Sequence, residues 1–202
     1  MNSELISLNS ESATNRLILL HGWGANADDL IPIGKQLIEN LSEVFEIVSF
    51  SAPNYHPDGF GREWYSLYPH KWDEVPNAVA DLEKRLNNLC FDQIPLNKSL
   101  VLGFSQGGAM ALELAARIKF QGVFVVGSYP HPQWQPSKNM PPTYLYHGNM
   151  DEIVPKSASQ KSYEILLSYG VESKLFFFDA GHEINKDLID HCREIIQKQF
   201  LN

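Results

Sequence analysis

Ser105 lies at the centre of Gly103-Phe104-Ser105-Gln106-Gly107, which matches the pattern G-x-S-x-G. A short apolar run precedes the match, as in a strand buried on both faces, and good helix formers follow it. This context predicts a sharp strand-to-helix turn with the serine at its tip. Backbone N–H groups at the start of such a helix favour negative charge at the serine oxygen. We interpret Ser105 as a nucleophile; the alternative is a tight turn whose serine only caps the helix.

A serine hydroxyl is a weak nucleophile at neutral pH and needs a base within hydrogen-bond reach. His182 directly follows the last expected strand, and an imidazole can take the serine proton and return it to a leaving group. Asp151 follows the preceding strand and could orient the imidazole. Glu152 and Asp179 are alternative acids, because neighbours in loops cannot be separated from the sequence. The chain order of serine, acid and histidine fits a known arrangement of a catalytic triad.

A serine nucleophile also requires two hydrogen-bond donors for the oxyanion that forms on the substrate. The backbone N–H of Gln106, directly after the serine, is one expected donor. The second is expected in the loop after an early strand, where we assign it to the backbone N–H of Trp23 in His21-Gly22-Trp23-Gly24. We expect His21 and His147 to order their turns rather than to react.

A metal site and a cysteine nucleophile are the alternatives to the serine mechanism. The residues His21, His147, Asp151 and His182 could converge on a metal ion, but no H-x-x-x-H or C-x-x-C spacing supports this, so no metal is expected. The two cysteines, Cys90 and Cys192, lie in expected helix ends away from any glycine-rich turn, so we interpret them as structural free thiols.

These side chains must be positioned by strands that alternate with helices. Such alternation predicts one α/β domain over residues 1–202, with a mostly parallel sheet of about six to seven strands and helices on both faces. Residues 51–73 lack periodicity and contain many aromatic residues, which is more often functional than idle. The other expected strands are 5–8, 16–20, 44–50, 121–126, 143–146 and 171–178; the strand–turn–helix unit ends near 118, and helices are expected at 26–41, 74–89, 156–169 and 185–200.

The composition of the chain bears on its binding partners and says little about its chemistry. The formal net charge of −8 argues against nucleic acid and anionic membrane surfaces as main partners. The first residues lack the basic and apolar regions of a signal peptide, and no apolar run approaches the ~18 residues of a membrane span. A cytoplasmic location is therefore the default expectation.

Several islands of the chain resemble the phospholipase/carboxylesterase family, which includes bacterial carboxylesterases and acyl-protein thioesterases. The resemblance covers roughly residues 16–184. Its parts are Leu20-His21-Gly22-Trp23-Gly24-Ala25-Asn26, Arg62-Glu63-Trp64-Tyr65, Gly103-Phe104-Ser105-Gln106-Gly107-Gly108-Ala109-Met110-Ala111, His147-Gly148 with Asp151 and Val154-Pro155, and Gly181-His182-Glu183-Ile184. The chain departs from the family at Ser66, where an aspartate is usual, and in the segment 127–132.

The resemblance implies an α/β-hydrolase fold, no cofactor, and hydrolysis of carboxylic esters or thioesters. Trp64, Tyr65, Trp72 and Trp134 are candidates for an apolar acyl groove, although core packing is the better interpretation for at least two of them. The alternatives are an acyltransferase that uses the same triad and a catalytically silent binding protein on the same scaffold. Exposed aromatic residues near a groove are also compatible with a homodimer.

Overall fold

The computed structural model describes residues 5–8, 11–89 and 94–201 of the chain. Its centre is a seven-stranded sheet in the order β1-β3-β2-β6-β7-β8-β9. All neighbouring strands run parallel except β1, which pairs antiparallel with β3 at one edge. The strands are β1 (Leu5–Leu8), β2 (Asn15–Leu20), β3 (Phe45–Phe50), β6 (Ser99–Phe104), β7 (Gly122–Val126), β8 (Thr143–Gly148) and β9 (Ser173–Phe178). The expected mostly parallel sheet, including the short edge strand, is confirmed.

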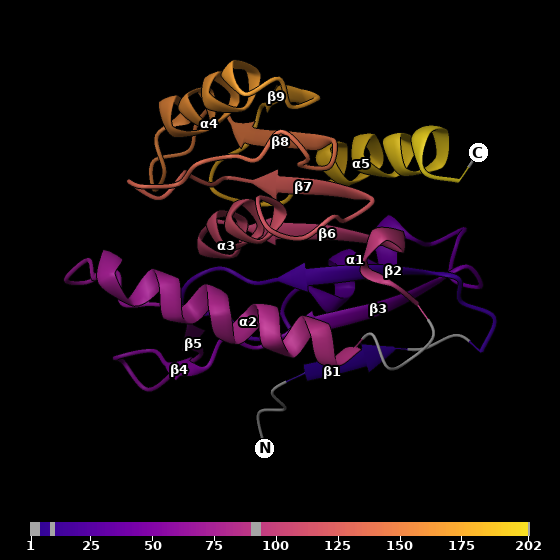
Figure 1. Cartoon of the computed structure of the whole chain (residues 1–202), viewed down its shortest axis with the longest axis horizontal. Helices are drawn as coiled ribbons and strands as arrows, with labels where there is room; N and C mark the ends of the chain where they lie inside the picture. The colour runs from indigo at the N-terminus through magenta and orange to yellow at the C-terminus, as the bar shows by residue number, and fades with distance from the viewer. Residues whose placement is uncertain (1–4, 9–10, 90–93, 202) are drawn as a thin grey trace.

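Helices cover both faces of this sheet. In Figure 1, α2 (Val75–Leu89), α3 (Gln106–Ala115) and α4 (Lys156–Ser168) lie in front of it, while α1 (Ile31–Leu37) and α5 (Lys186–Gln199) pack together on the other face. Side chains of the buried strands alternate between two apolar clusters, one under each helix layer. Ile18 and Leu20 of β2, for example, join the cluster with α2 and α3, whereas Leu17 and Leu19 join the cluster with α1 and α5. This alternation follows from the two-residue period of a strand.

The register of the sheet brings the ends of the central strands together. Leu20 of β2 lies beside Gly103 of β6, and Phe104 lies beside Val126 of β7. Because these strands are parallel, the loops that follow them leave the sheet at the same edge, toward which the arrows of β2, β7 and β8 point on the left of Figure 1. Such an edge is where ligands bind in open α/β sheets.

The prediction of a helix from Asn26 to Leu41 is wrong at both ends, because α1 covers only Ile31–Leu37. Pro32 explains the late start: a proline in a helix interior would clash with the carbonyl four residues earlier, so it can stand only in the first turn. The carboxylates expected in that first turn lie before the helix. There the backbone N–H of Asn26 donates to Asp29 Oδ2 at 2.7 Å, and that of Asp28 donates to Asn26 Oδ1 at 2.7 Å.

The aromatic-rich segment 51–73 contains more structure than its sequence indicates. It holds a two-stranded antiparallel hairpin of β4 (Asn54–Tyr55) and β5 (Arg62–Glu63), and the short helix η1 (Trp72–Glu74) begins near its end. A second short helix, η2 (Leu96–Lys98), precedes β6.

Cys192 is a free, buried thiol in the middle of α5 rather than at a helix end. Cys90 lies outside the described residues. No helix in the described ranges combines the length and the apolar character that crossing a bilayer requires.

Candidate active site

The turn at Ser105 has the strained backbone that the sequence predicts. Ser105 has φ 53° and ψ −118°, and it is the single non-glycine residue with a positive φ in the described part of the chain. Such a conformation costs about 1–3 kcal/mol and persists only where its surroundings enforce it. Here its N–H donates to Val126 O at 2.8 Å, and its carbonyl accepts from Ser128 Oγ at 2.7 Å.

The start of α3 approaches the end of β2 so closely that only glycine fits there. A Cβ on Gly107 would lie 2.1 Å from Leu20 O, far inside any real contact. A Cβ on Gly22 would lie 3.3 Å from Ser105 Cβ. The loop after β2 and the serine turn are therefore in direct contact, as the assignment of two oxyanion donors requires.

Asp151 and His182 are joined by a hydrogen bond. His182 Nδ1 lies 2.7 Å from Asp151 Oδ2, and the side chain of Asp151 is only 1% exposed. The second carboxylate oxygen, Oδ1, accepts from the N–H groups of Ile153 and Val154 at 2.9 and 2.8 Å. Burial raises the pKa of Asp151, but the hydrogen bonds from His182 and from the two N–H groups outweigh it and hold the pKa below its usual range.

Of the three acids that the sequence offers, Asp151 is the one in contact with the histidine within the described ranges. Glu152 is exposed, and Asp179 is exposed and accepts a hydrogen bond from Asn149 Nδ2 at 3.0 Å. An ionised Asp151 fixes the proton of His182 on Nδ1 and leaves Nε2 as the basic nitrogen.

His182 lies next to the serine turn. Its ring packs against Phe104, with centroids 4.8 Å apart, and a Cβ on Gly127 would lie 3.3 Å from its Cε1 and Nδ1 atoms. Phe104 directly precedes Ser105, and Gly127 directly follows Val126, which accepts the hydrogen bond of the serine N–H. Among the described residues, Ser105 Oγ makes no hydrogen bond to His182. Catalytic contacts of this kind are often loose without substrate.

His147 supports the acid, in agreement with a role in ordering the turn. This fully buried side chain has Nε2 2.8 Å from Val154 O and 3.3 Å from Asp151 Oδ2, and Nδ1 2.6 Å from Ser159 Oγ. Because Nε2 faces two acceptors, it must carry a proton. His147 therefore adds a fourth N–H group directed at the Asp151 carboxylate.

The two expected oxyanion donors carry free N–H groups. Neither the backbone N–H of Trp23 nor that of Gln106 donates to any other described residue. His21, at the start of this loop, is fully buried, and burial lowers its pKa to about 4. Its Nε2 accepts from the N–H of Ala52 at 2.9 Å, and its Nδ1 lies 2.7 Å from Gly22 O.

The aromatic candidates for an acyl groove are mostly inside the protein. Trp64 and Tyr65 are 1% and 0% exposed, and Trp134 is 6% exposed. The indole N–H groups of Trp64 and Trp134 donate to His21 O at 2.9 Å and Leu112 O at 3.0 Å. Trp72 is exposed at 36%. Trp64, Tyr65 and Trp134 are therefore packed in the interior, as the core-packing interpretation expects.

Tyr65 belongs to a buried polar chain that the sequence does not reveal. Its hydroxyl lies 2.8 Å from Tyr129 Oη and 2.8 Å from His131 Nε2, and His131 Nδ1 lies 3.0 Å from Glu113 Oε1. Burial raises the pKa of Tyr65 above its usual range and that of Tyr129 to about 12, so both phenols stay neutral. Tyr129 and His131 come from the segment 127–132, one of the departures from the family pattern.

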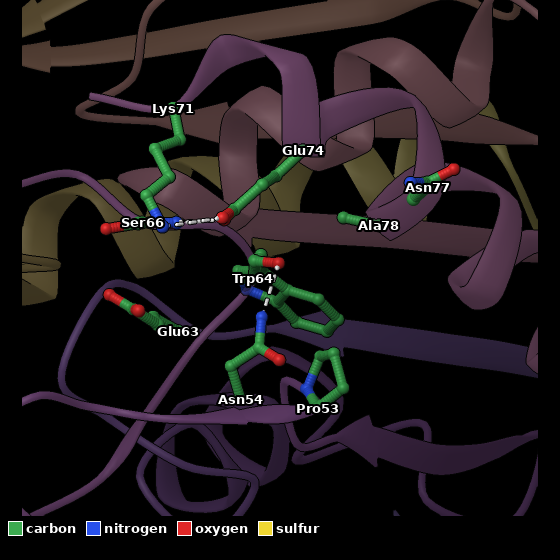
Figure 2. Close-up of a pocket in the computed structure, with 9 residues that line it drawn as sticks. All are labelled: Pro53, Asn54, Glu63, Trp64, Ser66, Lys71, Glu74, Asn77 and Ala78. Atoms are coloured by element: carbon green, nitrogen blue, oxygen red, sulfur yellow. Dashed lines mark hydrogen bonds and ion pairs between the residues drawn. The ribbon is translucent and has the colours of Figure 1, made fainter. Parts of the chain in front are cut away.

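A pocket of about 410 Å³ opens beside the segment 63–66. Figure 2 shows its walls, which come from the hairpin, from this segment and from the beginning of α2. Within it, Glu74 Oε2 accepts from the N–H of Ser66 at 3.0 Å, and Lys71 Nζ lies 3.1 Å from Glu74 Oε1. Ser105, Asp151 and His182 are not among the residues that line it.

The strand order, the serine turn and the Asp151–His182 pair define an α/β-hydrolase. The sequence model of the Phospholipase/Carboxylesterase family matches residues 1–200, so the chain belongs to that family of carboxylic ester hydrolases. It is 23% identical to acyl-protein thioesterase 1 homolog 2 of Dictyostelium discoideum, covering 97% of this chain and 98% of the relative. It is 27% identical to esterase YpfH of Escherichia coli, covering 94% of this chain and 87% of the relative.

Solved structures of esterases share the fold. The crystal structure of esterase PE8 matches with a TM-score of 0.88 at 23% identity, over 98% of this chain and 100% of that one. This likeness establishes the α/β-hydrolase architecture, and the contacts described above place the candidate residues within it.

Proposed function

We propose that the protein is a serine esterase that hydrolyses carboxylic esters through a Ser105–His182–Asp151 triad. The observation that carries this proposal is the hydrogen bond between Asp151 and His182 directly beside the strained turn of Ser105. In the mechanism, Ser105 Oγ attacks the ester carbonyl carbon while His182 Nε2 takes the hydroxyl proton. The N–H groups of Trp23 and Gln106 stabilise the oxyanion that forms.

The remaining steps of the reaction use the same groups. The protonated His182 gives its proton to the departing alkoxide, which leaves as an alcohol and produces an acyl-enzyme on Ser105. Water then loses a proton to His182 Nε2 and attacks the acyl carbonyl. When this second tetrahedral intermediate collapses, the bond to Ser105 Oγ breaks, His182 returns the proton to Oγ, and the acid is released. Asp151 stabilises the imidazolium in both halves and stays ionised throughout, because its pKa lies below the usual range.

Hydrolysis of p-nitrophenyl esters by the wild type and by Ser105→Ala tests the proposal. Removal of such a nucleophile costs ~10⁶ in turnover, so the variant is expected to be inactive. A fluorophosphonate probe should label the wild type covalently and should leave Ser105→Ala unlabelled. Activity that survives in Ser105→Ala would reject the mechanism, and labelling without turnover would favour a binding protein on this scaffold.

The same assay, run with a panel of substrates, measures which acyl length and which type of ester the protein prefers. We propose that oxygen esters and thioesters are the two substrate classes to compare, because the matched relatives include proteins named esterase and acyl-protein thioesterase. Matched oxygen esters and thioesters of graded acyl length should give a ranked series of kcat/KM values. An added alcohol that captures the acyl group faster than water would instead identify an acyltransferase.

We also propose that residues 1–202 form a single domain. Strands of the one large sheet come from both ends of the described chain, β1 at Leu5–Leu8 and β9 at Ser173–Phe178, and α5 packs against α1. One cooperative unfolding transition, seen at the same denaturant concentration by two spectroscopic probes, is the expected result.

A further inference from the structure

We infer that Glu63 is a positioning residue that fixes the Trp23 loop and thereby places one oxyanion donor; this inference rests on the proposed function. Glu63 lies in the segment Arg62-Glu63-Trp64-Tyr65, and 40 residues separate it from Trp23 in the chain. The indole Nε1–H of Trp23 donates to Glu63 Oε2 at 2.7 Å. Hydrogen bonds to a charged acceptor are short and roughly twice as strong as neutral ones.

Contacts from the same segment, two from its backbone and one from a side chain, hold the loop on both sides of Trp23. The N–H of Gly24 donates to Arg62 O at 2.9 Å, and the N–H of Arg62 donates to Ala25 O at 2.7 Å. The indole of Trp64 donates to His21 O at 2.9 Å. These contacts hold His21, Gly24 and Ala25, and the N–H of Trp23 between them donates to no other described residue.

The segment is equally tied to the second donor. Gln106 is fully buried, and its side chain accepts from the N–H of Trp64 at 3.0 Å while it donates to Tyr65 O at 2.7 Å. Gln106 is also the residue whose backbone N–H follows the nucleophile. Residues 62–65 therefore connect the two halves of the oxyanion hole, and the distance between the two N–H groups depends on this segment.

Within the segment, Glu63 supplies the one side-chain contact that reaches Trp23. It is 6% exposed, and burial of a carboxylate is costly unless hydrogen bonds compensate it. The rest of the Trp23 side chain is packed by rings, with His56 at 4.0 Å and Tyr68 at 5.4 Å between centroids. Ring packing limits the position of the indole, whereas the bond to Glu63 fixes its rotation.

Figure 2 shows why the neighbouring carboxylate is a matched control. Glu63 and Glu74 both line the pocket, but the Glu63 side chain is directed away from Glu74. Glu74 pairs with Lys71 and with the N–H of Ser66 at the end of the segment, and neither contact involves Trp23. Loss of Glu74 should therefore disturb the same pocket and leave the bond between Glu63 and Trp23 in place.

The experiment compares four single variants and one double variant with the wild type on a p-nitrophenyl ester. Complete loss of an oxyanion donor costs ~10²–10³ in turnover, so a displaced donor in Glu63→Ala should lower kcat about 10- to 100-fold. KM should stay within about twofold, since the donor acts on the transition state rather than on bound substrate. Glu63→Gln should keep most of kcat because its amide oxygen still accepts the indole N–H. Glu74→Ala should match the wild type.

Trp23→Phe is the fourth variant and supplies an independent route to the same contact. It keeps the ring and the backbone N–H but removes the indole donor, so its kcat should fall as in Glu63→Ala. The double variant with Trp23→Phe and Glu63→Ala should lose no more kcat than the worse of the two single variants, because both substitutions remove the same hydrogen bond. This arm keeps the test decisive even if Glu63→Ala fails to fold.

The outcomes separate the inference from the proposed function. Activity in Ser105→Ala would overturn both. An inactive Ser105→Ala together with full kcat in Trp23→Phe or Glu63→Ala would overturn only the positioning role. A rise in KM at unchanged kcat, or additive losses in the double variant, would also overturn it, because Trp23 would then contact substrate and Glu63 would act separately.

Discussion

His21 should make the folded protein less stable as the pH falls from about 6.5 toward about 4. The imidazole is fully buried, and both nitrogens are engaged, Nε2 as acceptor from the N–H of Ala52 and Nδ1 as donor to Gly22 O. Burial lowers its pKa from 6.5 to about 4, against the opposing hydrogen bond to Gly22. The neutral ring is therefore built into the fold.

The sign of the effect follows from proton binding in the two states. Below about pH 6.5 the unfolded chain binds a proton at His21, whereas the folded protein does not bind it until about pH 4. The free energy of unfolding therefore falls as the pH falls through this window, by at most about 1.4 kcal/mol for each pH unit. Between about pH 8 and about pH 5, the loss due to His21 is about 2 kcal/mol.

Urea unfolding of the wild type and of His21→Gln over this pH range measures the loss. The glutamine removes the titrating group, so the wild type should lose about 2 kcal/mol more than the variant between about pH 8 and about pH 5. Contributions from all other groups cancel in this difference, and a variant that is less stable at every pH still reports the slope. Parallel curves would refute the reasoning, as would an NMR titration that places the pKa of His21 near 6.5.

Three further changes test other parts of the structure. Asp151→Asn should lower kcat by ~10⁴, because an amide does not hold His182 in the productive tautomer, and a pre-steady-state measurement of acylation would show it. Glu46→Ala should reduce the free energy of unfolding by about 3–5 kcal/mol, measured in urea, since it leaves the buried Arg16 guanidinium without its carboxylate. Gly107→Ala should destabilise the fold and abolish activity together, because its Cβ would overlap a carbonyl oxygen at the end of β2; a thermal midpoint equal to that of the wild type would contradict this geometry.

The sheet was predictable because its strands carry continuous apolar runs that only a buried position explains. Parallel strands place their carboxyl ends at one edge of the sheet, so polar residues directly after strands could be expected there. Asp151 and His182 do meet there, and Ser105 adopts the positive φ that its flanking glycines indicate. In each case a physical requirement restricts the residue type strongly enough to be visible in one sequence.

The prediction of a helix over 26–41 is wrong because the polar residues at its start fit two different local structures. Asn26, Asp28 and Asp29 suit the first turn of a helix, but they also suit turns in which their side chains bind nearby N–H groups, and the structure uses the second option. Pro32 carried the deciding information, because it can stand in the first turn of a helix but not in its interior. A prediction that gave Pro32 more weight than the carboxylates would have placed the start of the helix near Ile31.

The contacts that connect the site were beyond the reach of the sequence for a different reason. Attack on a carbonyl requires a nucleophile, a base and an acid of particular chemistry, so those residue types are constrained. A contact such as that between Glu63 and Trp23 requires only an acceptor at one point in space, which many residues at many positions could supply. The same holds for His131, which joins Glu113 to Tyr65 although Tyr65 lies far from both in the chain. Residues that hold a site in place are therefore identified from the structure. Their contribution to catalysis is measured by the coupling between variants and does not follow from residue type.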